Sequence, residues 1–144
     1  SLAKWPGRLQ TTKWKGMPIV VDGAHNPQAA KQLSLERDSW TDQEKGIIWI
    51  LGMQKQKDMM NILHNLIKEQ DLAWIVPIPF HESWSKNEVL SYCPQYSTQI
   101  KEALSVEEVL SILKKGKEWP SPPPIITGSL YLIGDLFKRQ VLKS

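Results

Sequence analysis

The sequence is poor in cysteine, in unbalanced charge and in long apolar runs. Cys93 is the only cysteine among 144 residues, which excludes an internal disulfide and favours a reducing, cytoplasmic location. No run of about 18 apolar residues is present, so no transmembrane helix and no membrane association are expected. The formal net charge is only +3, and the densest basic cluster, residues 114–117, follows an amphipathic segment. Nucleic-acid binding is therefore not expected.

The chain also lacks a glycine-rich phosphate loop. It contains neither GxGxxG nor GxxxxGK[ST], because Gly116-Lys117 is preceded by no suitable glycine and followed by Glu118. Chemistry on a nucleoside triphosphate would need a phosphate loop from another domain. His64 and His81 have no partner at the spacing of metal ligands, so no metal site is expected in this chain.

The composition is that of one globular domain, with 41% apolar and 23% charged residues. Short apolar segments alternate with amphipathic ones along the whole of residues 1–144. This alternation predicts an α/β, Rossmann-like domain, with a mostly parallel sheet and helices on both faces. Strands are expected at 8–12, 17–21, 46–52, 72–78 and 125–127, and helices at 27–37, 58–70, 87–92, 105–116 and 130–142, with Ser105 and Glu108 as a capping box.

The most informative segment is residues 20–27, VVDGAHNP. A β-branched run ends here in polar residues, and Pro27 suits the first turn of a helix that Asn26 can cap. Asp22 and His25 are thus expected where a strand's carboxyl end meets a helix N-terminus, which is where open α/β sheets bind ligands. Asp, Gly and Asn are also ordinary turn residues, so a purely structural role is the alternative.

Two further motifs accompany this one. WPGRLQ occupies residues 5–10 and ITGSLYLIG occupies residues 126–134. In this order and spacing, the three motifs closely resemble the C-terminal domain of folylpolyglutamate synthase/dihydrofolate synthase, a family of the Mur-ligase superfamily. Together they span nearly the whole chain. The resemblance implies the fold of a Mur ligase C-terminal domain and a longer, two-domain enzyme, which is consistent with a chain that begins at Ser1.

The resemblance further implies an ATP-dependent ligase. Such an enzyme uses ATP and Mg²⁺ to convert a carboxylate of folate or dihydropteroate into an acyl phosphate, and the amine of L-glutamate then attacks it. The expected partner is the N-terminal ATPase domain of the same chain, which would hold the phosphate loop and most of the metal site. We expect a monomer, and we expect residues 1–144 alone to be inactive. The residues do not distinguish dihydrofolate synthase, folylpolyglutamate synthase or an enzyme with both activities.

The resemblance also assigns roles to single residues. Asp22 would accept hydrogen bonds from the ATP ribose, and His25 would contact ATP near the reacting groups. Arg8, otherwise a surface charge, would bind the phosphates or the transferred group as a planar, permanent cation. Asn26 and Ser129 would lie on the L-glutamate side of the site, although Ser129 is equally suited to cap the last helix.

Lys57 matches a family position at which Lys-Asp usually follows another Asp, and Gln56 stands there instead. A role for Lys57 beyond helix capping is therefore not assigned. Cys93 is expected to be a small buried apolar residue, because no neighbour suggests an activated thiolate.

Two alternatives remain from the sequence. One is a Mur-type ligase domain from peptidoglycan synthesis, which adds another amino acid but has the same fold and type of reaction as the folate enzymes. The other is a non-enzymatic flavodoxin-like or receiver-like binding module. A phosphate loop encoded upstream of Ser1 would separate the ligases from the binding module.

Overall fold

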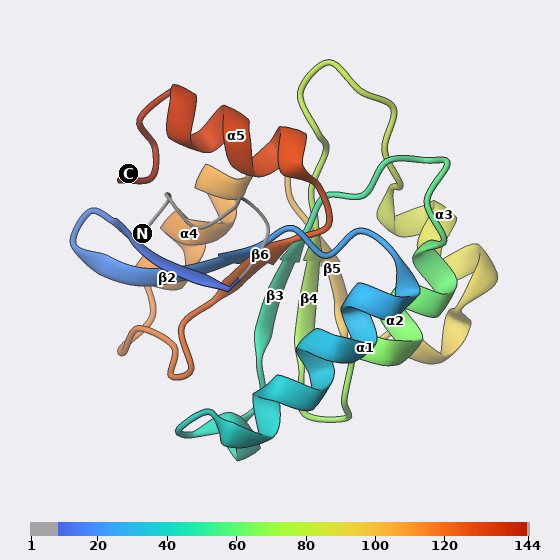
Figure 1. Ribbon diagram of the computed structural model, residues 1–144, viewed down its shortest axis with the longest axis horizontal. Helices are drawn as coiled ribbons and strands as arrows, with labels where there is room; N and C mark the ends of the chain where they lie inside the picture. Colours follow the sequence, from blue (N-terminus) through green and yellow to red (C-terminus); the bar gives the residue numbers. More distant parts are fainter. Residues whose placement is uncertain (1–8, 144) are drawn as a thin grey trace.

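The computed structural model describes residues 9–143. Six strands and five α-helices follow one another as β1 (Gln10–Trp14), β2 (Met17–Asp22), α1 (Pro27–Glu36), β3 (Ile48–Leu51), α2 (Met59–Leu66), β4 (Leu72–Ile75), α3 (Lys86–Tyr92), β5 (Ile100–Glu102), α4 (Val106–Lys114), β6 (Ile125–Thr127) and α5 (Leu130–Lys138). Single 3-10 turns lie at Arg37–Ser39, Gln43–Lys45 and Pro94–Tyr96. All six strands form one sheet in the order β1-β2-β6-β3-β4-β5 (Figure 1).

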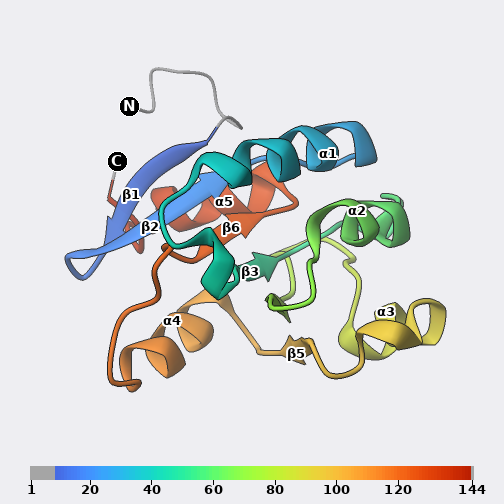
Figure 2. The same ribbon diagram turned by 90° about the horizontal axis from the view of Figure 1, so that it is seen from below.

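Helices cover both faces of this sheet, and each face has its own core. Buried residues of α1, α2 and α3 pack on one face, and those of α4 and α5 pack on the other (Figure 2). Strand β3 serves both cores, because Trp49 and Leu51 belong to the first and Ile50 to the second. This alternation follows from the two-residue period of a strand, and it explains why β3 is apolar throughout.

The last strand of the chain lies in the middle of the sheet. Strand β6 is inserted between β2 and β3 and runs parallel to both, while only β1 is antiparallel to its neighbour. The mostly parallel α/β sheet expected from the sequence is thus confirmed. The five parallel strands lie across the sheet in the order β2-β6-β3-β4-β5. When they are numbered in chain order, this is first, fifth, second, third and fourth. Flavodoxin-like domains have the order second, first, third, fourth, fifth, so the flavodoxin-like or receiver-like alternative is wrong.

Some boundaries differ from the sequence prediction. The edge strand β5 was not predicted, and β1 lies two residues later than expected. Helix α2 ends at Leu66 rather than near residue 70, because the backbone N–H of Lys68 turns to the buried carboxylate of Asp71. Helix α5 ends at Lys138 rather than near residue 142, and Gln140 has a positive φ of 62° that a helix cannot continue through.

The expected capping box at Ser105 forms only in part. Ser105 Oγ accepts a hydrogen bond from the N–H of Glu108, but Glu108 Oε1 accepts from the N–H of Leu104 and not from Ser105. A complete capping box occurs instead at the start of α3, between Ser85 and Glu88. Among the described residues, no helix is long and apolar enough to cross a membrane.

Candidate functional site

Three loops meet at the carboxyl ends of the central strands and enclose a hollow of about 480 Å³. The loops follow β2, β3 and β6 and lead into α1, α2 and α5, so three helix N-termini converge at this edge (Figure 1). The side chains and backbone that line the hollow come from His25, Gln54, Gln56, Lys57, Gly128, Ser129, Leu130 and Tyr131. None of these residues is acidic, and helix N-termini favour anions. The hollow therefore suits a negatively charged group.

Two glycines allow the loops to approach this closely. Gly128 has a φ of 109°, and a Cβ there would lie only 2.5 Å from the carbonyl oxygen of Gly52. A Cβ on Gly52 would in turn lie 2.7 Å from the side chain of Leu132. The N–H of Gly52 donates to the carbonyl of Thr127 at 3.3 Å, which joins the ends of β3 and β6. Larger residues at either glycine would push the loops apart.

Asp22 ends β2 and is not among the residues that line the hollow. Its side chain is buried, with the residue 8% exposed, and Oδ1 accepts a hydrogen bond of 2.9 Å from the N–H of Ala24. The hydroxyl of Thr127 binds the carbonyl of Ala24 at 3.4 Å, which fixes the same turn to β6. Asp22 thus has the turn-forming role that the sequence left open as an alternative. Its location at the strand end is as predicted.

His25 lines the hollow and is held by its own loop. Nδ1 lies 2.8 Å from the carbonyl oxygen of Gly23. When Nδ1 donates this hydrogen bond, Nε2 is an acceptor in the neutral ring and a donor in the protonated ring. The loop therefore orients an imidazole at the wall of the hollow and leaves its second nitrogen for a ligand.

Asn26 lies next to His25 but does not line the hollow. It is exposed, and its Oδ1 accepts a hydrogen bond of 2.8 Å from the N–H of Ala29. Asn26 is therefore the N-cap of α1, with Pro27 at the first position of the helix, as the sequence indicated. The resemblance implies a contact between Asn26 and L-glutamate. This geometry does not include that contact, which stays a prediction.

Ser129, in the loop after β6, lines the hollow and caps α5. Its Oγ accepts from the N–H groups of Tyr131 at 3.1 Å and Leu132 at 3.3 Å, and the residue is 3% exposed. Capping leaves the hydroxyl hydrogen as a donor for a further acceptor. A carboxylate in the hollow would be such an acceptor, so capping and ligand binding are compatible at this residue.

The loop after β3 supplies the lysine of the hollow. Lys57 is half-buried in its lining, and Asp58 caps α2 by accepting from the N–H and the side-chain amide of Asn61. Gln54 was not singled out from the sequence, yet its amide nitrogen lies 3.4 Å from His81 Nδ1. Tyr131 was also missed, although it belongs to the third motif. Its ring stacks on His81 with centroids 4.2 Å apart.

Arg8, to which the resemblance assigns a contact with phosphates, lies outside the described residues. Within residues 9–143, no group of three or more His, Cys, Asp or Glu side chains gathers in a way that could hold a metal ion. Cys93 is a buried free cysteine, 4% exposed, and burial raises the pKa of its thiol. The expectation of a small, buried cysteine is confirmed.

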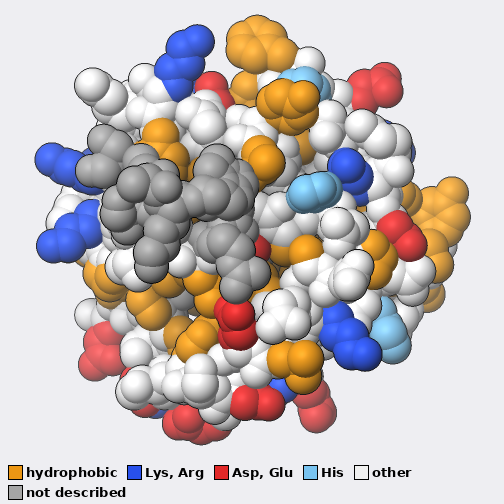
Figure 3. Space-filling model, in the orientation of Figure 1, with side chains coloured by type: hydrophobic (Ala, Val, Ile, Leu, Met, Phe, Trp, Pro, Cys, Tyr) orange, Lys and Arg blue, Asp and Glu red, His pale blue; other side chains and the backbone are white. Residues whose placement is uncertain are grey.

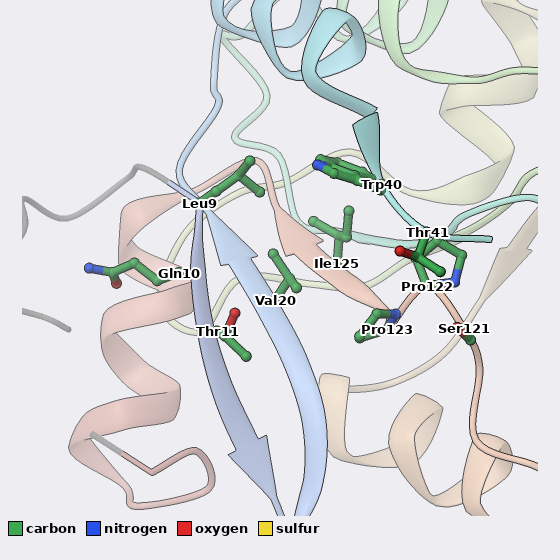
Figure 4. A pocket seen from close by; sticks show the side chains of 10 residues that line it. All are labelled: Leu9, Gln10, Thr11, Val20, Trp40, Thr41, Ser121, Pro122, Pro123 and Ile125. Carbon is green, nitrogen blue, oxygen red and sulfur yellow. The ribbon is translucent and has the colours of Figure 1, made fainter. Parts of the chain in front are cut away.

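A second hollow, of about 370 Å³, lies beside β1 and β2, away from these loops (Figure 4). It is mainly apolar, with Leu9, Val20, Trp40 and Ile125 among its lining, and none of its lining residues is charged. It therefore lacks the groups that acid–base chemistry or phosphate binding requires. The hollow at the strand ends is the better candidate site.

The fold and the site together define the class of the protein. It is an open α/β protein with a polar crevice at the carboxyl ends of its strands. Comparison with protein families makes the assignment more specific. Residues 7–139 match the family described as "Dihydrofolate synthetase, C-terminal domain". The chain belongs to this family.

Individual proteins give the same result. A probable dihydrofolate synthetase of Schizosaccharomyces pombe is 26% identical over 145 residues, covering 93% of this chain and 34% of the relative. Folylpolyglutamate synthase of Mycobacterium tuberculosis, solved with ADP and AMPPCP, has a TM-score of 0.77 at 16% identity, covering 94% of this chain and 32% of that chain. A bifunctional folylpolyglutamate synthase/dihydrofolate synthase solved with Mn, AMPPNP and L-glutamate has a TM-score of 0.73 at 19% identity, with 97% and 32% covered.

The structural matches establish the fold, which is the Mur ligase C-terminal type expected from the sequence. The chain spans about a third or less of the length of the curated relatives it matches. The family assignment supports the folate resemblance and not the peptidoglycan ligase alternative.

Proposed function

We propose that this chain is the C-terminal, glutamate-binding domain of a two-domain, ATP-dependent ligase that joins L-glutamate to dihydropteroate or folate. The observation that carries the proposal is the hollow itself. His25 and Ser129 come from loops more than 100 residues apart, and they line one carboxylate-free space at the strand ends. Relatives and fold neighbours named as dihydrofolate and folylpolyglutamate synthases support the reaction class.

In this reaction the γ-phosphoryl group of ATP passes to a carboxylate of the acceptor, giving an acyl phosphate and ADP. The amine of L-glutamate attacks the acyl carbon, an amide forms, and inorganic phosphate leaves. Asp22 is proposed to accept hydrogen bonds from the ribose, and His25 to donate to the phosphates or the developing oxyanion. Arg8 would add a permanent cation to the same region.

L-glutamate would bind in the hollow through its carboxylates. Ser129 Oγ and the N-terminus of α5 would hold one carboxylate. A contact of L-glutamate with Asn26, which caps α1 outside the lining of the hollow, is proposed from the resemblance alone. Catalysis would then depend chiefly on the positions of the amine and the acyl phosphate and on stabilised charge. The hollow offers hydrogen-bond donors and a lysine for anionic groups of the nucleotide and the amino acid, and its lining holds no carboxylate for a metal ion. Mg²⁺, which would neutralise charge on the phosphates, is assigned to the N-terminal ATPase domain.

The names of the family and of the S. pombe relative favour dihydropteroate as the acceptor to test first. The experiment is to express the full-length polypeptide that contains this chain and to supply ATP, Mg²⁺, L-glutamate and dihydropteroate. We expect ADP and phosphate to appear together with a product heavier by one glutamyl residue. The same assay with folate or its monoglutamate as acceptor then tests polyglutamylation.

D-Glutamate and a His25→Ala variant are the controls, and both should give little product. Amide formation with a muropeptide precursor in place of the folate acceptors would contradict the proposed substrate and indicate a Mur-type ligase. No ATP-dependent amide formation with any acceptor would contradict the ligase itself.

A further inference from the structure

A side-chain hydrogen bond joins two of the loops at the strand ends. Gln54, in the loop after β3, lines the hollow, and its amide nitrogen lies 3.4 Å from Nδ1 of His81 in the loop after β4. The amide donates this hydrogen bond when Nδ1 is the unprotonated nitrogen of a neutral ring. The amide oxygen of Gln54 has no hydrogen-bond partner among residues 9–143. One end of the amide is thus occupied, and the other end can bind a ligand in the hollow.

His81 is itself held in place. Its ring stacks on that of Tyr131, with centroids 4.2 Å apart and an angle of 24° between the planes. The N–H of His81 donates to the carbonyl of Ile78 at 3.2 Å, and Ile78 is buried in the second core. Figure 3 shows a histidine beside hydrophobic side chains at the upper edge of the molecule, over residues 76–85 and the start of α5. The imidazole is therefore a fixed partner for the amide of Gln54.

The backbone at Gln54 is held by the same loop. Gln54 and Ser83 form an antiparallel β-bridge, and the N–H of Lys55 donates to the carbonyl of Glu82 at 3.2 Å. Gln56, two residues further on, also lines the hollow, but it is exposed and its side chain bonds to no other described residue. Of the two glutamines in the lining, Gln54 is thus the one whose amide has a defined orientation.

The amine of an amino acid needs a different partner from its carboxylates. Lys57, the hydroxyl of Ser129 and the N-terminus of α5 suit carboxylates, and no lining residue is acidic. The N–H groups of an attacking amine need an acceptor, while its lone pair must stay free. A carboxylate acceptor would favour the protonated, unreactive ammonium form, because an opposite charge nearby stabilises that form. A neutral amide oxygen accepts an N–H group with a weaker effect of this kind, so a glutamine suits an attacking amine.

We propose that the amide oxygen of Gln54 binds the amine of the incoming L-glutamate, and that His81 positions Gln54 for this contact; this rests on the proposed function. Gln54 touches the substrate, whereas His81 acts through Gln54 and is a positioning residue. The carboxylates and the amine of L-glutamate are then bound by different groups of the hollow. Loss of the Gln54 amide should therefore weaken the binding of a ligand that carries an amine and spare a dicarboxylate that lacks one.

Glutarate tests the contact directly, because it has the carbon chain and both carboxylates of L-glutamate but no amine. The full-length polypeptide is titrated with each ligand in a calorimeter, in the presence of AMPPNP and Mg²⁺. In Gln54→Met, the dissociation constant of L-glutamate should rise roughly fivefold or more, and that of glutarate should stay within about twofold. Gln56→Met is the matched control and should change neither constant by more than about twofold.

Three results would overturn the proposal. Equal losses for L-glutamate and glutarate in Gln54→Met would show damage to the hollow rather than loss of an amine contact. Unchanged binding of L-glutamate in this variant would show that Gln54 makes no contact. A wild-type polypeptide that binds glutarate as tightly as L-glutamate would show that the amine has no partner.

A double-mutant cycle tests the role of His81. His81→Phe keeps a ring that can stack on Tyr131 but removes the nitrogen that accepts from Gln54. It should weaken L-glutamate roughly threefold or more and spare glutarate, with the midpoint of thermal unfolding unchanged. In the Gln54→Met background, His81→Phe should have no further effect, because it acts through Gln54; additive losses would refute the positioning role. These titrations need no turnover, so a polypeptide that binds as expected but forms no amide refutes the proposed reaction and supports the amine contact.

Discussion

Arg37 and Asp71 form a bidentate ion pair in which both side chains are completely buried. The two guanidinium–carboxylate hydrogen bonds are each 2.6 Å long, and both side chains are 0% exposed. Asp71 also accepts hydrogen bonds from the N–H of Ile47 at 2.8 Å and from the indole of Trp49 at 3.0 Å. One carboxylate thereby joins the end of α1 to the starts of β3 and β4, at the opposite end of the strands from the hollow.

Removal of one member of this pair should destabilise the domain strongly. Asp71→Asn leaves the Arg37 cation buried without its counter-charge, so we expect a loss of about 3–5 kcal/mol in the free energy of unfolding. Urea unfolding followed by circular dichroism measures this loss. The double variant Arg37→Met/Asp71→Asn removes both charges and keeps an amide oxygen that can accept from Ile47 or Trp49, so it should recover part of the stability. A loss below about 1 kcal/mol in Asp71→Asn would contradict the assigned importance of the pair.

Acid should also weaken the domain through Asp71. Burial raises the pKa of this carboxyl, but hydrogen bonds from Arg37, Ile47, Trp49 and Lys68 outweigh burial and lower it below its ordinary value. A group whose pKa is lower in the folded state contributes stability above its unfolded pKa, about 3.9, and this contribution is lost as the pH falls through the folded pKa. The thermal midpoint should therefore fall as the pH is lowered from about 5 to below 3.

The double variant at Arg37 and Asp71 is again the control for the pH series. The pKa of Glu107, which Arg139 lowers through a hydrogen bond, contributes acid sensitivity to both proteins. The difference between the two pH profiles isolates Asp71. Identical profiles would show that Asp71 does not titrate as expected.

Asp22 offers a test that separates nucleotide binding from turn formation. In the full-length enzyme, Asp22→Ala should weaken ATP use by about 1.5–3 kcal/mol and affect L-glutamate use less, because hydrogen bonds to a charged acceptor are lost. Asp22→Asn retains an oxygen that can accept from Ala24, removes the charge and replaces the second acceptor oxygen with an amide donor. We expect Asp22→Asn to keep wild-type stability and still show a raised Michaelis constant for ATP. Normal ATP kinetics in both variants would leave Asp22 as a turn residue.

Ser129→Ala should chiefly raise the Michaelis constant for L-glutamate. Loss of one hydrogen bond costs about 1–2 kcal/mol, or roughly five- to thirtyfold in that constant. Loss of the N-cap should also cost about 1 kcal/mol of stability. Ser105→Ala is the matched control, because Ser105 caps α4 through a similar hydrogen bond to Glu108 and does not line the hollow. Equal glutamate kinetics in the two variants would assign Ser129 to capping alone.

The chain by itself should bind ATP weakly and catalyse no ligation. The hollow offers one wall of the proposed nucleotide site, without a phosphate loop. Calorimetric titration with ATP and Mg²⁺ should give a dissociation constant near the millimolar range, about −4 kcal/mol. Micromolar binding would mean that residues 1–144 hold a complete nucleotide site. This would contradict the proposal that the N-terminal ATPase domain supplies the phosphate loop.

The sequence was sufficient to predict the strand–turn–helix segments of the site. The apolar run before Asp22 and the cap-and-proline pair Asn26-Pro27 define one such segment, and Ser129 before an amphipathic stretch defines another. These signals are local, because a strand's apolar residues and a helix cap lie within a few positions of one another. Both segments are found where they were expected.

Features that depend on distant parts of the chain were not predictable in this way. Strand β5 has only three residues, two of them charged and exposed, and it exists because it pairs with β4. The contact of His81 with Tyr131 joins residues 50 positions apart, and the Arg37–Asp71 pair joins residues 34 positions apart. No periodicity in one sequence encodes such pairings, so the His81–Tyr131 stack and the buried ion pair required the structure.

The central location of β6 has a consequence for synthesis of the protein. In β6, Ile125 pairs with Val20 of β2 on one side and with Trp49 of β3 on the other, so β2 and β3 have no shared neighbour until residue 125 has been synthesised. A ribosome-bound nascent chain that ends before residue 125 would expose two unpaired apolar strand edges, which are templates for aggregation. Domains of this topology therefore have to fold late, and a stop codon anywhere before β6 removes the strand that closes the sheet.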